Sequence, residues 1–112
     1  MPVKHIKGNE IETAAAVTDK ISLVDFSASW CGPCKMLEPV LEQVSDELEN
    51  TVGFYHVDVD ESPAESSKFG IRGVPTMIVF HDGREIDRMV GFRDRNALQT
   101  HLIDLSDSKL NN

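Results

Sequence analysis

Two cysteines separated by two residues are the side chains in this sequence best placed to do chemistry. Cys31 and Cys34 are the only cysteines, with Gly32 and Pro33 between them. This spacing brings two sulfur atoms within bonding distance across one helical turn. At a helix start, free backbone N–H groups and the helix dipole favour a thiolate on the first cysteine. The second lies one turn further in, where it can resolve a mixed disulfide, so we predict a redox-active pair.

Three other uses of the two cysteines are less favoured by the pattern. A zinc site usually needs four ligands, and the four histidines are scattered, so zinc would require a dimer. A purely structural disulfide would close too small a loop to stabilise the chain much. Inert buried thiols would make no use of a Gly-Pro spacer at a junction between strand and helix. The histidines are His5, His56, His81 and His101.

One carboxylate interrupts an otherwise apolar segment just before the cysteines. Asp25 lies within the run 21–26, which has the pattern of a strand buried on both faces. Burying a charged carboxylate costs several kcal/mol, so we expect its pKa to be raised. The alternative is that Asp25 faces solvent at the end of the strand.

The elements that must hold these residues alternate along the chain, in the order βαβαβα followed by ββα. This order predicts an α/β layer fold whose sheet is parallel at first and antiparallel at its last hairpin. Asn9 is expected to cap the first helix, Pro39 to kink the second, Gly70 to end the third, and Asp82-Gly83 to form the hairpin turn. We expect strands at about 3–6, 21–26, 52–59, 76–80 and 85–90, and helices at about 9–20, 33–48, 62–70 and 94–106.

Composition narrows the class of protein. The chain has 112 residues, with 40% hydrophobic and 27% charged residues, so we expect one globular domain over 1–112. The formal net charge of -8 disfavours nucleic acid and membrane partners. The N-terminal residues lack an apolar run of the length that a signal peptide needs, so we expect a cytoplasmic protein. Structural disulfides are rare in that compartment, which again favours redox chemistry.

The sequence resembles the thioredoxin family. The similarity runs in order from about residue 5 to about residue 105, with the family's lengths between motifs. It implies an α/β thioredoxin fold, with a central mixed five-stranded sheet flanked by four helices in a single three-layer domain. The matching residues are Val24-Asp25-Phe26, Trp30-Cys31-Gly32-Pro33-Cys34-Lys35, Pro39, Phe69-Gly70-Ile71-Arg72-Gly73-Val74-Pro75-Thr76, Gly83 and Gly91.

The resemblance also implies a role for each matched site residue. Cys31 would be the nucleophile, Cys34 the resolving thiol, and Asp25 the proton acceptor that activates Cys34 through water. Pro75 resembles the family's cis proline. Gly91 has an equally good structural explanation, as a bulge or strand terminator. The implied substrate-binding surface comprises Trp30, Gly32, Pro33, Gly73, Val74, Pro75 and Gly91.

By the same resemblance, the chain would be a monomeric protein-disulfide reductase. Its spacer holds no cationic group that would stabilise a thiolate, which favours a reductant over an oxidant. It would bind no cofactor and would receive electrons from NADPH through a flavin-containing thioredoxin reductase, passing them to disulfide-containing client proteins. A binding module without redox turnover is the alternative from another class, and nothing obvious in the sequence would cradle glutathione.

Two positions depart from the family's common pattern. Ser27 stands where many relatives carry a second tryptophan, which leaves Trp30 as the only one. His56 stands where many bacterial members carry a lysine near the buried aspartate. A protonated His56 close to Asp25 would lower the pKa of that carboxyl.

Overall fold

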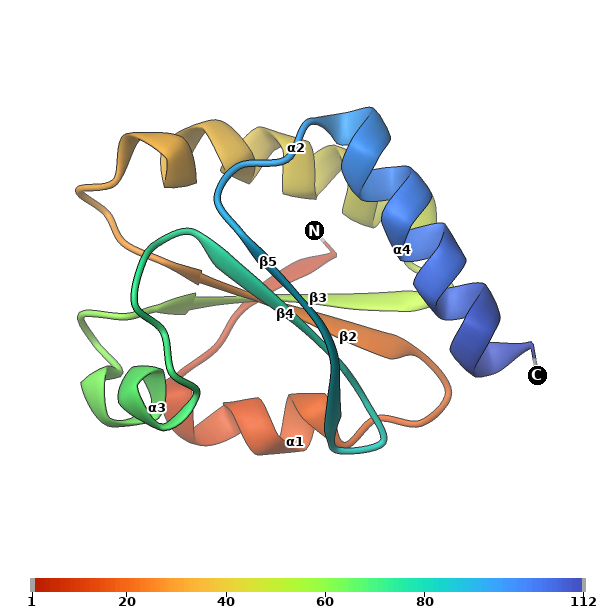
Figure 1. Ribbon diagram of the computed structural model, residues 1–112, viewed down its shortest axis with the longest axis horizontal. Helices are drawn as coiled ribbons and strands as arrows, with labels where there is room; N and C mark the ends of the chain where they lie inside the picture. Colours follow the sequence, from red (N-terminus) through yellow and green to blue (C-terminus); the bar gives the residue numbers. More distant parts are fainter. Residues whose placement is uncertain (1, 112) are drawn as a thin grey trace.

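The computed structural model describes residues 2–111, folded as a five-stranded sheet between two layers of helices (Figure 1). The strands are β1 (Val3–His5), β2 (Ile21–Ser27), β3 (Val52–Asp58), β4 (Thr76–His81) and β5 (Arg84–Val90). The helices are α1 (Ile11–Ala15), α2 (Gly32–Leu48), α3 (Pro63–Lys68) and α4 (Arg95–Leu110). The predicted element order is confirmed, with α2 and α4 on one face of the sheet and α1 and α3 on the other. None of the helices described is long and apolar enough to cross a membrane.

The sheet is mixed, and its antiparallel part is larger than predicted. Its strand order is β1-β3-β2-β4-β5, in which β3 runs parallel to both β1 and β2. The sequence predicts antiparallel pairing at the last hairpin alone, whereas β4 already runs antiparallel to β2. The chain enters β4 beside the end of β2, where Phe26 pairs with Thr76. The segment before β4 therefore lies next to the segment that follows β2.

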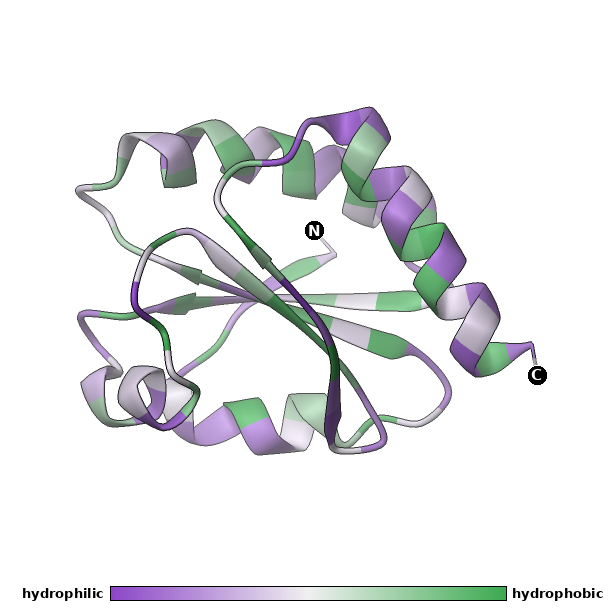
Figure 2. Ribbon diagram, viewed as in Figure 1, coloured by the Kyte–Doolittle hydropathy of each residue, from purple (hydrophilic) through white to green (hydrophobic). Residues whose placement is uncertain are grey.

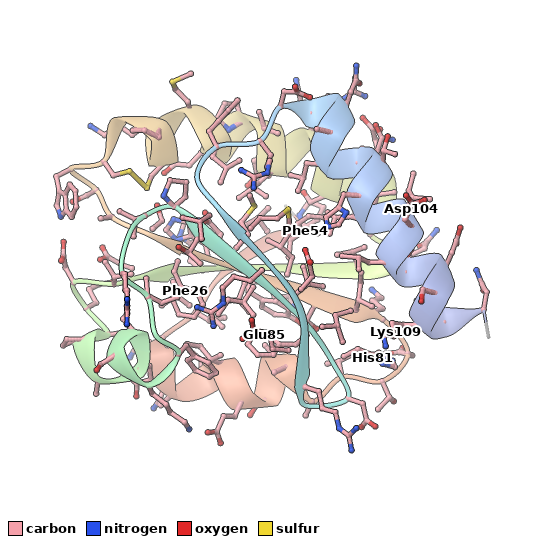
Figure 3. All side chains as sticks on the ribbon, viewed as in Figure 1. Phe26, Phe54, His81, Glu85, Asp104 and Lys109 are labelled. Atoms are coloured by element: carbon pink, nitrogen blue, oxygen red, sulfur yellow. A yellow bond between two sulfur atoms is a disulfide. The ribbon has the colours of Figure 1, made fainter. Side chains whose placement is uncertain are left out.

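Two apolar clusters, one on each face, fix the sheet between the helices. All seven residues of β2 are buried, as a strand covered on both sides requires. Leu37 of α2 and Leu98 of α4 pack with Phe54 on one face, whereas Ile11 of α1 packs with Phe26 on the other. Phe26 and Phe54 are labelled in Figure 3. Figure 2 shows hydrophobic residues in the strands of the sheet and in parts of the helices that cover it.

The first helix is shorter than predicted and begins differently. A 3-10 turn over Gly8–Glu10 leads into α1, and the Glu10 carboxylate accepts the Lys7 N–H at 2.9 Å, so Asn9 is not the cap. The helix was expected to reach residue 20 but ends at Ala15. The Ala15 carbonyl accepts the N–H of Gly83, 2.9 Å away in the β4–β5 turn. This long-range hydrogen bond occupies the Ala15 carbonyl, which a longer helix would have used within its own backbone. The local sequence does not reveal such a contact with Gly83.

The two long helices each begin within one residue of the predicted position. In α2 the apolar positions face the sheet, except that Met36 is 62% exposed, because its place near the helix start lies beyond the sheet-facing stripe. Asp94 caps α4 by accepting the N–H of Ala97 at 2.9 Å. The helix runs to Leu110, four residues further than expected, because its last turn is largely exposed and gives no hydrophobic signal. The kink expected at Pro39 stays a prediction, and α2 is continuous through that residue.

Two turns match the sequence analysis closely. Asp82 and Gly83 connect β4 to β5 with φ values of 53° and 79°, the geometry of a tight two-residue hairpin. Gly70 follows α3 with a φ of 68°, and its N–H donates to the Ser67 carbonyl at 3.0 Å. Arg88 of β5 donates to the Phe69 carbonyl at 2.8 Å, which ties the end of α3 to the sheet. The chain therefore leaves α3 in a fixed direction, toward the start of β4.

The left-handed backbone of Gly70 generates a stability prediction. A side chain in this conformation costs roughly 1–2 kcal/mol, so Gly70→Ala should lower the free energy of unfolding by about that amount. Gly73→Ala is the matched control, because Gly73 lacks a left-handed φ and an added Cβ would meet no atom within 4 Å. We expect the control to stay within about 0.5 kcal/mol of the unsubstituted chain in urea unfolding. Equal losses in both variants would contradict this assignment.

Candidate active site

The cysteine pair lies at the junction of β2 and α2, as the sequence predicted. Cys31 is the N-cap residue of α2, with φ -93° and ψ 115°, and Pro33 occupies the first turn. The Cys31 Sγ atom accepts the N–H of Cys34 at 3.2 Å. The two residues form a disulfide with Cα atoms 5.3 Å apart, visible in Figure 3 at the start of α2. The sulfur of Cys31 thus lies at the N-terminal end of α2, where free backbone N–H groups and the helix dipole favour negative charge.

The two cysteine residues differ slightly in their exposure to solvent. Cys31 is 5% exposed and Cys34 is 1% exposed, so the residue at the helix end is the more accessible. Ala28, Val59 and Val74 pack against the pair and form a small apolar collar. Gly32 and Pro33 are exposed at the surface beside them. The geometry therefore distinguishes an outer cysteine from an inner one.

The loop before β4 lies directly against the cysteines. The Val74–Pro75 bond is cis, as the resemblance implied, and the Val74 carbonyl oxygen is 3.6 Å from the Sγ atom of Cys31. The Thr76 hydroxyl donates to the Gly73 carbonyl at 2.6 Å, which closes the loop on itself. Pro75 is buried, Val74 is half-buried and Gly73 is exposed.

Gly91 belongs to the same region. It directly follows β5, and its N–H donates to the Pro75 carbonyl at 2.8 Å. The strand-terminator explanation for this glycine is therefore correct as a structural description. The hydrogen bond also places it beside the loop that contacts the cysteines. The fold therefore brings together four separate parts of the chain, namely residues 28–34, Val59, the loop 73–76 and Gly91.

Exposed apolar side chains surround these segments. Trp30 is 69% exposed, and its indole N–H donates to the Asp60 carboxylate at 2.9 Å, which fixes the ring at the surface. The sequence analysis did not single out Met36, Val90 or Phe92, although each lies within two residues of a predicted site residue. Met36 lies four residues before Val40, a spacing typical of one apolar helix face, and only its exposed fraction reveals it as a surface residue. Among the described residues, the exposed large hydrophobic side chains are Trp30, Met36, Val90, Phe92 and Ile103.

Asp25 lies at the centre of the sheet, and it is completely buried. This excludes the alternative in which it faces solvent at the strand end. Within the described residues, neither carboxylate oxygen has a hydrogen-bonding partner. Burial, and to a smaller extent the nearby charge of Glu38 on α2, raises the pKa of Asp25 to about 7. Glu38 was missed by the sequence analysis because only the packing of α2 on β2 brings the two carboxylates together.

The two departures from the family pattern are both close to this carboxylate. His56 of β3 pairs in register with Asp25, and Ser27 is buried two residues further along β2. Burial, together with the charge of His5, lowers the pKa of His56, whereas Glu38 and Asp58 raise it less. The imidazole is therefore neutral near pH 7, and the protonated His56 considered in the sequence analysis is not the form that the packing favours.

The described residues contain no group of three or more His, Cys, Asp or Glu side chains that could hold a metal ion. What the arrangement can do is exchange electrons through its sulfur pair, beside a buried carboxyl group of raised pKa.

Comparison with known proteins agrees with this geometry. A family model described as Thioredoxin matches residues 2–104. A thioredoxin of Staphylococcus aureus is 40% identical over 93 residues, covering 83% of this chain and 89% of its own length. A mutant thioredoxin from Halobacterium salinarum has a TM-score of 0.80 at 38% identity, covering 96% of this chain and 90% of its own. A thioredoxin of Malassezia sympodialis has a TM-score of 0.83 at 40% identity, covering 93% and 90%. The chain belongs to the thioredoxin family of thiol–disulfide oxidoreductases.

Proposed function

We propose that the chain is a protein-disulfide reductase that uses Cys31 as its nucleophile and Cys34 as its resolving thiol. The observation that carries this proposal is the asymmetry of the pair. Cys31 is the more exposed of the two residues, and its sulfur accepts a backbone N–H at the N-terminal end of α2, whereas Cys34 lies one turn further in. A thiolate at the first position is therefore both accessible and stabilised.

The reaction proceeds through two thiol–disulfide exchanges. The Cys31 thiolate attacks one sulfur of a client disulfide, and the other client sulfur leaves as a thiolate. Cys34 then attacks the Sγ atom of Cys31, which releases the second client sulfur and leaves the Cys31–Cys34 disulfide. Two electrons pass to the client. Cys34 must lose a proton to attack, and we assign Asp25 as the acceptor, through water, because it is buried near this end of β2 with a pKa near neutrality.

A client would bind across the loop before β4. The backbone of Val74 is positioned beside Cys31, where it can pair with an extended client strand. Gly73 and Gly91 leave this surface without projecting side chains, while Pro75 holds the loop in shape. Trp30, Gly32 and Pro33 complete the surface on the other side of the sulfurs. The exposed apolar side chains near these segments suit partners that offer an unfolded or extended apolar strand.

The remaining parts of the proposal concern the electron supply. Members of this family need no cofactor of their own, so electrons would come from NADPH through a thioredoxin reductase. Gly32 and Pro33 carry no cationic group, which favours a reducing potential. We further propose that the chain acts as one domain and as a monomer, in the cytoplasm, where clients and reductant would meet. Turnover of a disulfide-containing protein with a small dithiol as reductant tests the reductase activity, and its absence in the intact chain would refute it.

The cysteines should behave asymmetrically. Cys31→Ser should abolish client reduction, because no nucleophile remains at the helix end. Cys34→Ser should capture an oxidised client as a stable mixed disulfide, because the resolving thiol is lost. Mass spectrometry of both variants after incubation with the client distinguishes these results. Equal capture by the two variants would show that the nucleophile is wrongly assigned.

The residue between the cysteines should set the reduction potential. Pro33→His places an ionisable imidazole beside Cys31, which stabilises the thiolate and hence the reduced state. The potential should become more oxidising, by about 30 mV for each tenfold change in the equilibrium with glutathione. Pro33→Gln is the control for loss of the proline ring, and we expect it to shift the potential less. A glutathione titration in which both variants move equally would refute the electrostatic explanation.

Asp25 should destabilise the protein while serving its activity. Folding raises the pKa of Asp25 from an ordinary value near 3.8 to about 7. At a pH between these two values, the folded chain therefore keeps the Asp25 proton, whereas the unfolded chain has lost it. The free energy of unfolding therefore falls as pH rises through this interval, and the loss is complete above about pH 7. Each pKa unit corresponds to about 1.4 kcal/mol. Asp25→Asn should accordingly stabilise the chain by more at pH 8 than at pH 4.

The measurements are urea unfolding at the two pH values and the rate of client reduction. Asp25→Asn should reduce clients more slowly, by up to roughly 10²-fold at neutral pH, because Cys34 loses its proton acceptor. Asp104→Asn, at an exposed position of α4 labelled in Figure 3, should show neither effect. A stabilisation by Asp25→Asn that is no greater at pH 8 than at pH 4 contradicts the buried-acid assignment, and full activity contradicts the catalytic one.

A further inference from the structure

Three ionisable residues form a row across the sheet, from its edge to its centre. His5 of β1 pairs in register with His56 of β3, which pairs in register with Asp25 of β2. Paired residues of neighbouring strands project from the same face, and the strands lie about 4.8 Å apart. The rings of His5 and His56 are 4.4 Å apart between centroids. The row therefore connects the buried carboxylate with the solvent-facing edge strand.

Burial increases steadily along this row. His5 is exposed, His56 is half-buried and Asp25 has no exposed surface. Within residues 2–111, the buried side-chain polar atoms that lack a hydrogen-bonding partner are both Asp25 oxygens, Nε2 of His56 and Oε2 of Glu42. Such atoms are rare in folded proteins, and their concentration in one place points to a functional role.

A cleft of about 310 Å³ adjoins the outer part of the row. Its walls include His5, His56, Glu38 and Glu42, which bring two imidazoles and two carboxylates to one space. A water molecule occupies about 30 Å³, so the cleft has room for several molecules with polar partners on its walls. The cleft thus links the half-buried histidine with solvent.

We propose that His56, assisted by His5 and the adjoining cleft, carries protons between Asp25 and solvent. The proposal rests on the function assigned above, in which Asp25 accepts a proton from Cys34. Asp25 must release that proton before the next client is reduced, and complete burial denies it direct contact with bulk water. The row provides a route, with His56 acting as a positioning residue that touches neither client nor sulfur.

The proton transfer is balanced at each step. The Asp25 carboxyl group gives its proton through water to one ring nitrogen of His56 and becomes a carboxylate. The imidazolium then releases the proton on its other ring nitrogen toward the cleft, where His5 or water takes it. A relay of this kind requires a neutral imidazole at rest, which is the form that burial favours for His56.

The charges around His56 come from every element that packs on it. His5 of β1 disfavours its protonated form, whereas Glu38 of α2 and Asp58 of β3 favour it. Glu42 of α2 lines the same cleft, and Asp25 follows on the β2 side. These opposing influences allow His56 to take up a proton transiently without holding it at neutral pH.

The test follows the Asp25 carboxyl carbon by NMR through a pH titration of the full chain in its disulfide form, at low buffer concentration. With the route intact, the resonance should be a single averaged signal at every pH, because protons exchange rapidly. In His56→Gln the signal should broaden near the midpoint and be lost there, because exchange is slow. His5→Gln should broaden it less. His81→Gln is the matched control, a histidine at the end of β4 whose ring lies 3.1 Å from the Thr18 carbonyl.

Rescue by a small base provides the second readout. His56→Ala leaves space beside the cleft, so added imidazole should restore the averaged signal in proportion to its concentration. An unchanged signal in both His56 variants, or equal broadening in His81→Gln, would overturn the proposal, as would a lack of rescue. The catalytic assignment is tested separately by the activity of Asp25→Asn. Failure of that assignment leaves the exchange measurement unaffected, so the two results can be told apart.

Discussion

The antiparallel pairing of β4 with β2 is the constraint on which the site depends. Because Phe26 pairs with Thr76, the start of β4 lies beside the end of β2. Cys31 follows β2 by a short loop and Pro75 precedes β4 directly, so the register alone brings the sulfur pair and the proline loop together. A two-residue slip of this pairing would keep each β4 side chain on its own face of the sheet but would shift it along β2. It would also carry Val74 away from Cys31 and remove the surface on which a client strand could pair.

The same strand carries an electrostatic conflict. β2 is buried on both faces, which fixes its register firmly, yet it holds a carboxylate that has no protein hydrogen-bonding partner among the described residues. The apolar clusters on the two faces must outweigh that penalty. A carboxyl group with a pKa near 7 is of little use for stability but suits proton transfer at neutral pH. Under the proposed mechanism, the position of Asp25 meets a functional demand that the core tolerates.

Local sequence predicted most of the elements, and it failed where long-range contacts decide. The periodicity of α2 and the Asp-Gly turn were sufficient, because side-chain spacing and backbone preference act over a few residues. The early end of α1 was not predictable, because a carbonyl of that helix is taken by Gly83, far along the chain. The antiparallel direction of β4 relative to β2 likewise depends on where α3 delivers the chain.

In the site, too, local sequence predicts some features, whereas others depend on contacts between distant parts of the chain. The chemistry of Cys31 and Cys34 can be read from their spacing, and the burial of Asp25 from the apolar residues around it. The cis bond before Pro75 came from resemblance alone, since few bonds to proline are cis. Glu38 and His5 act on Asp25 and His56 from other elements, so no pattern in the sequence could assign them.

The two departures from the family pattern bear on this electrostatic environment more than on the sulfur chemistry. A lysine at position 56 would bring a permanent charge close to the carboxylate, and that charge would lower its pKa. The neutral imidazole here leaves burial and Glu38 as the dominant influences on Asp25. The affinity of Asp25 for a proton is consequently set by packing and by a neighbouring carboxylate rather than by a cation. A buried acid without a cationic partner holds its proton more firmly at neutral pH, and for that reason a route for releasing it matters more in this chain.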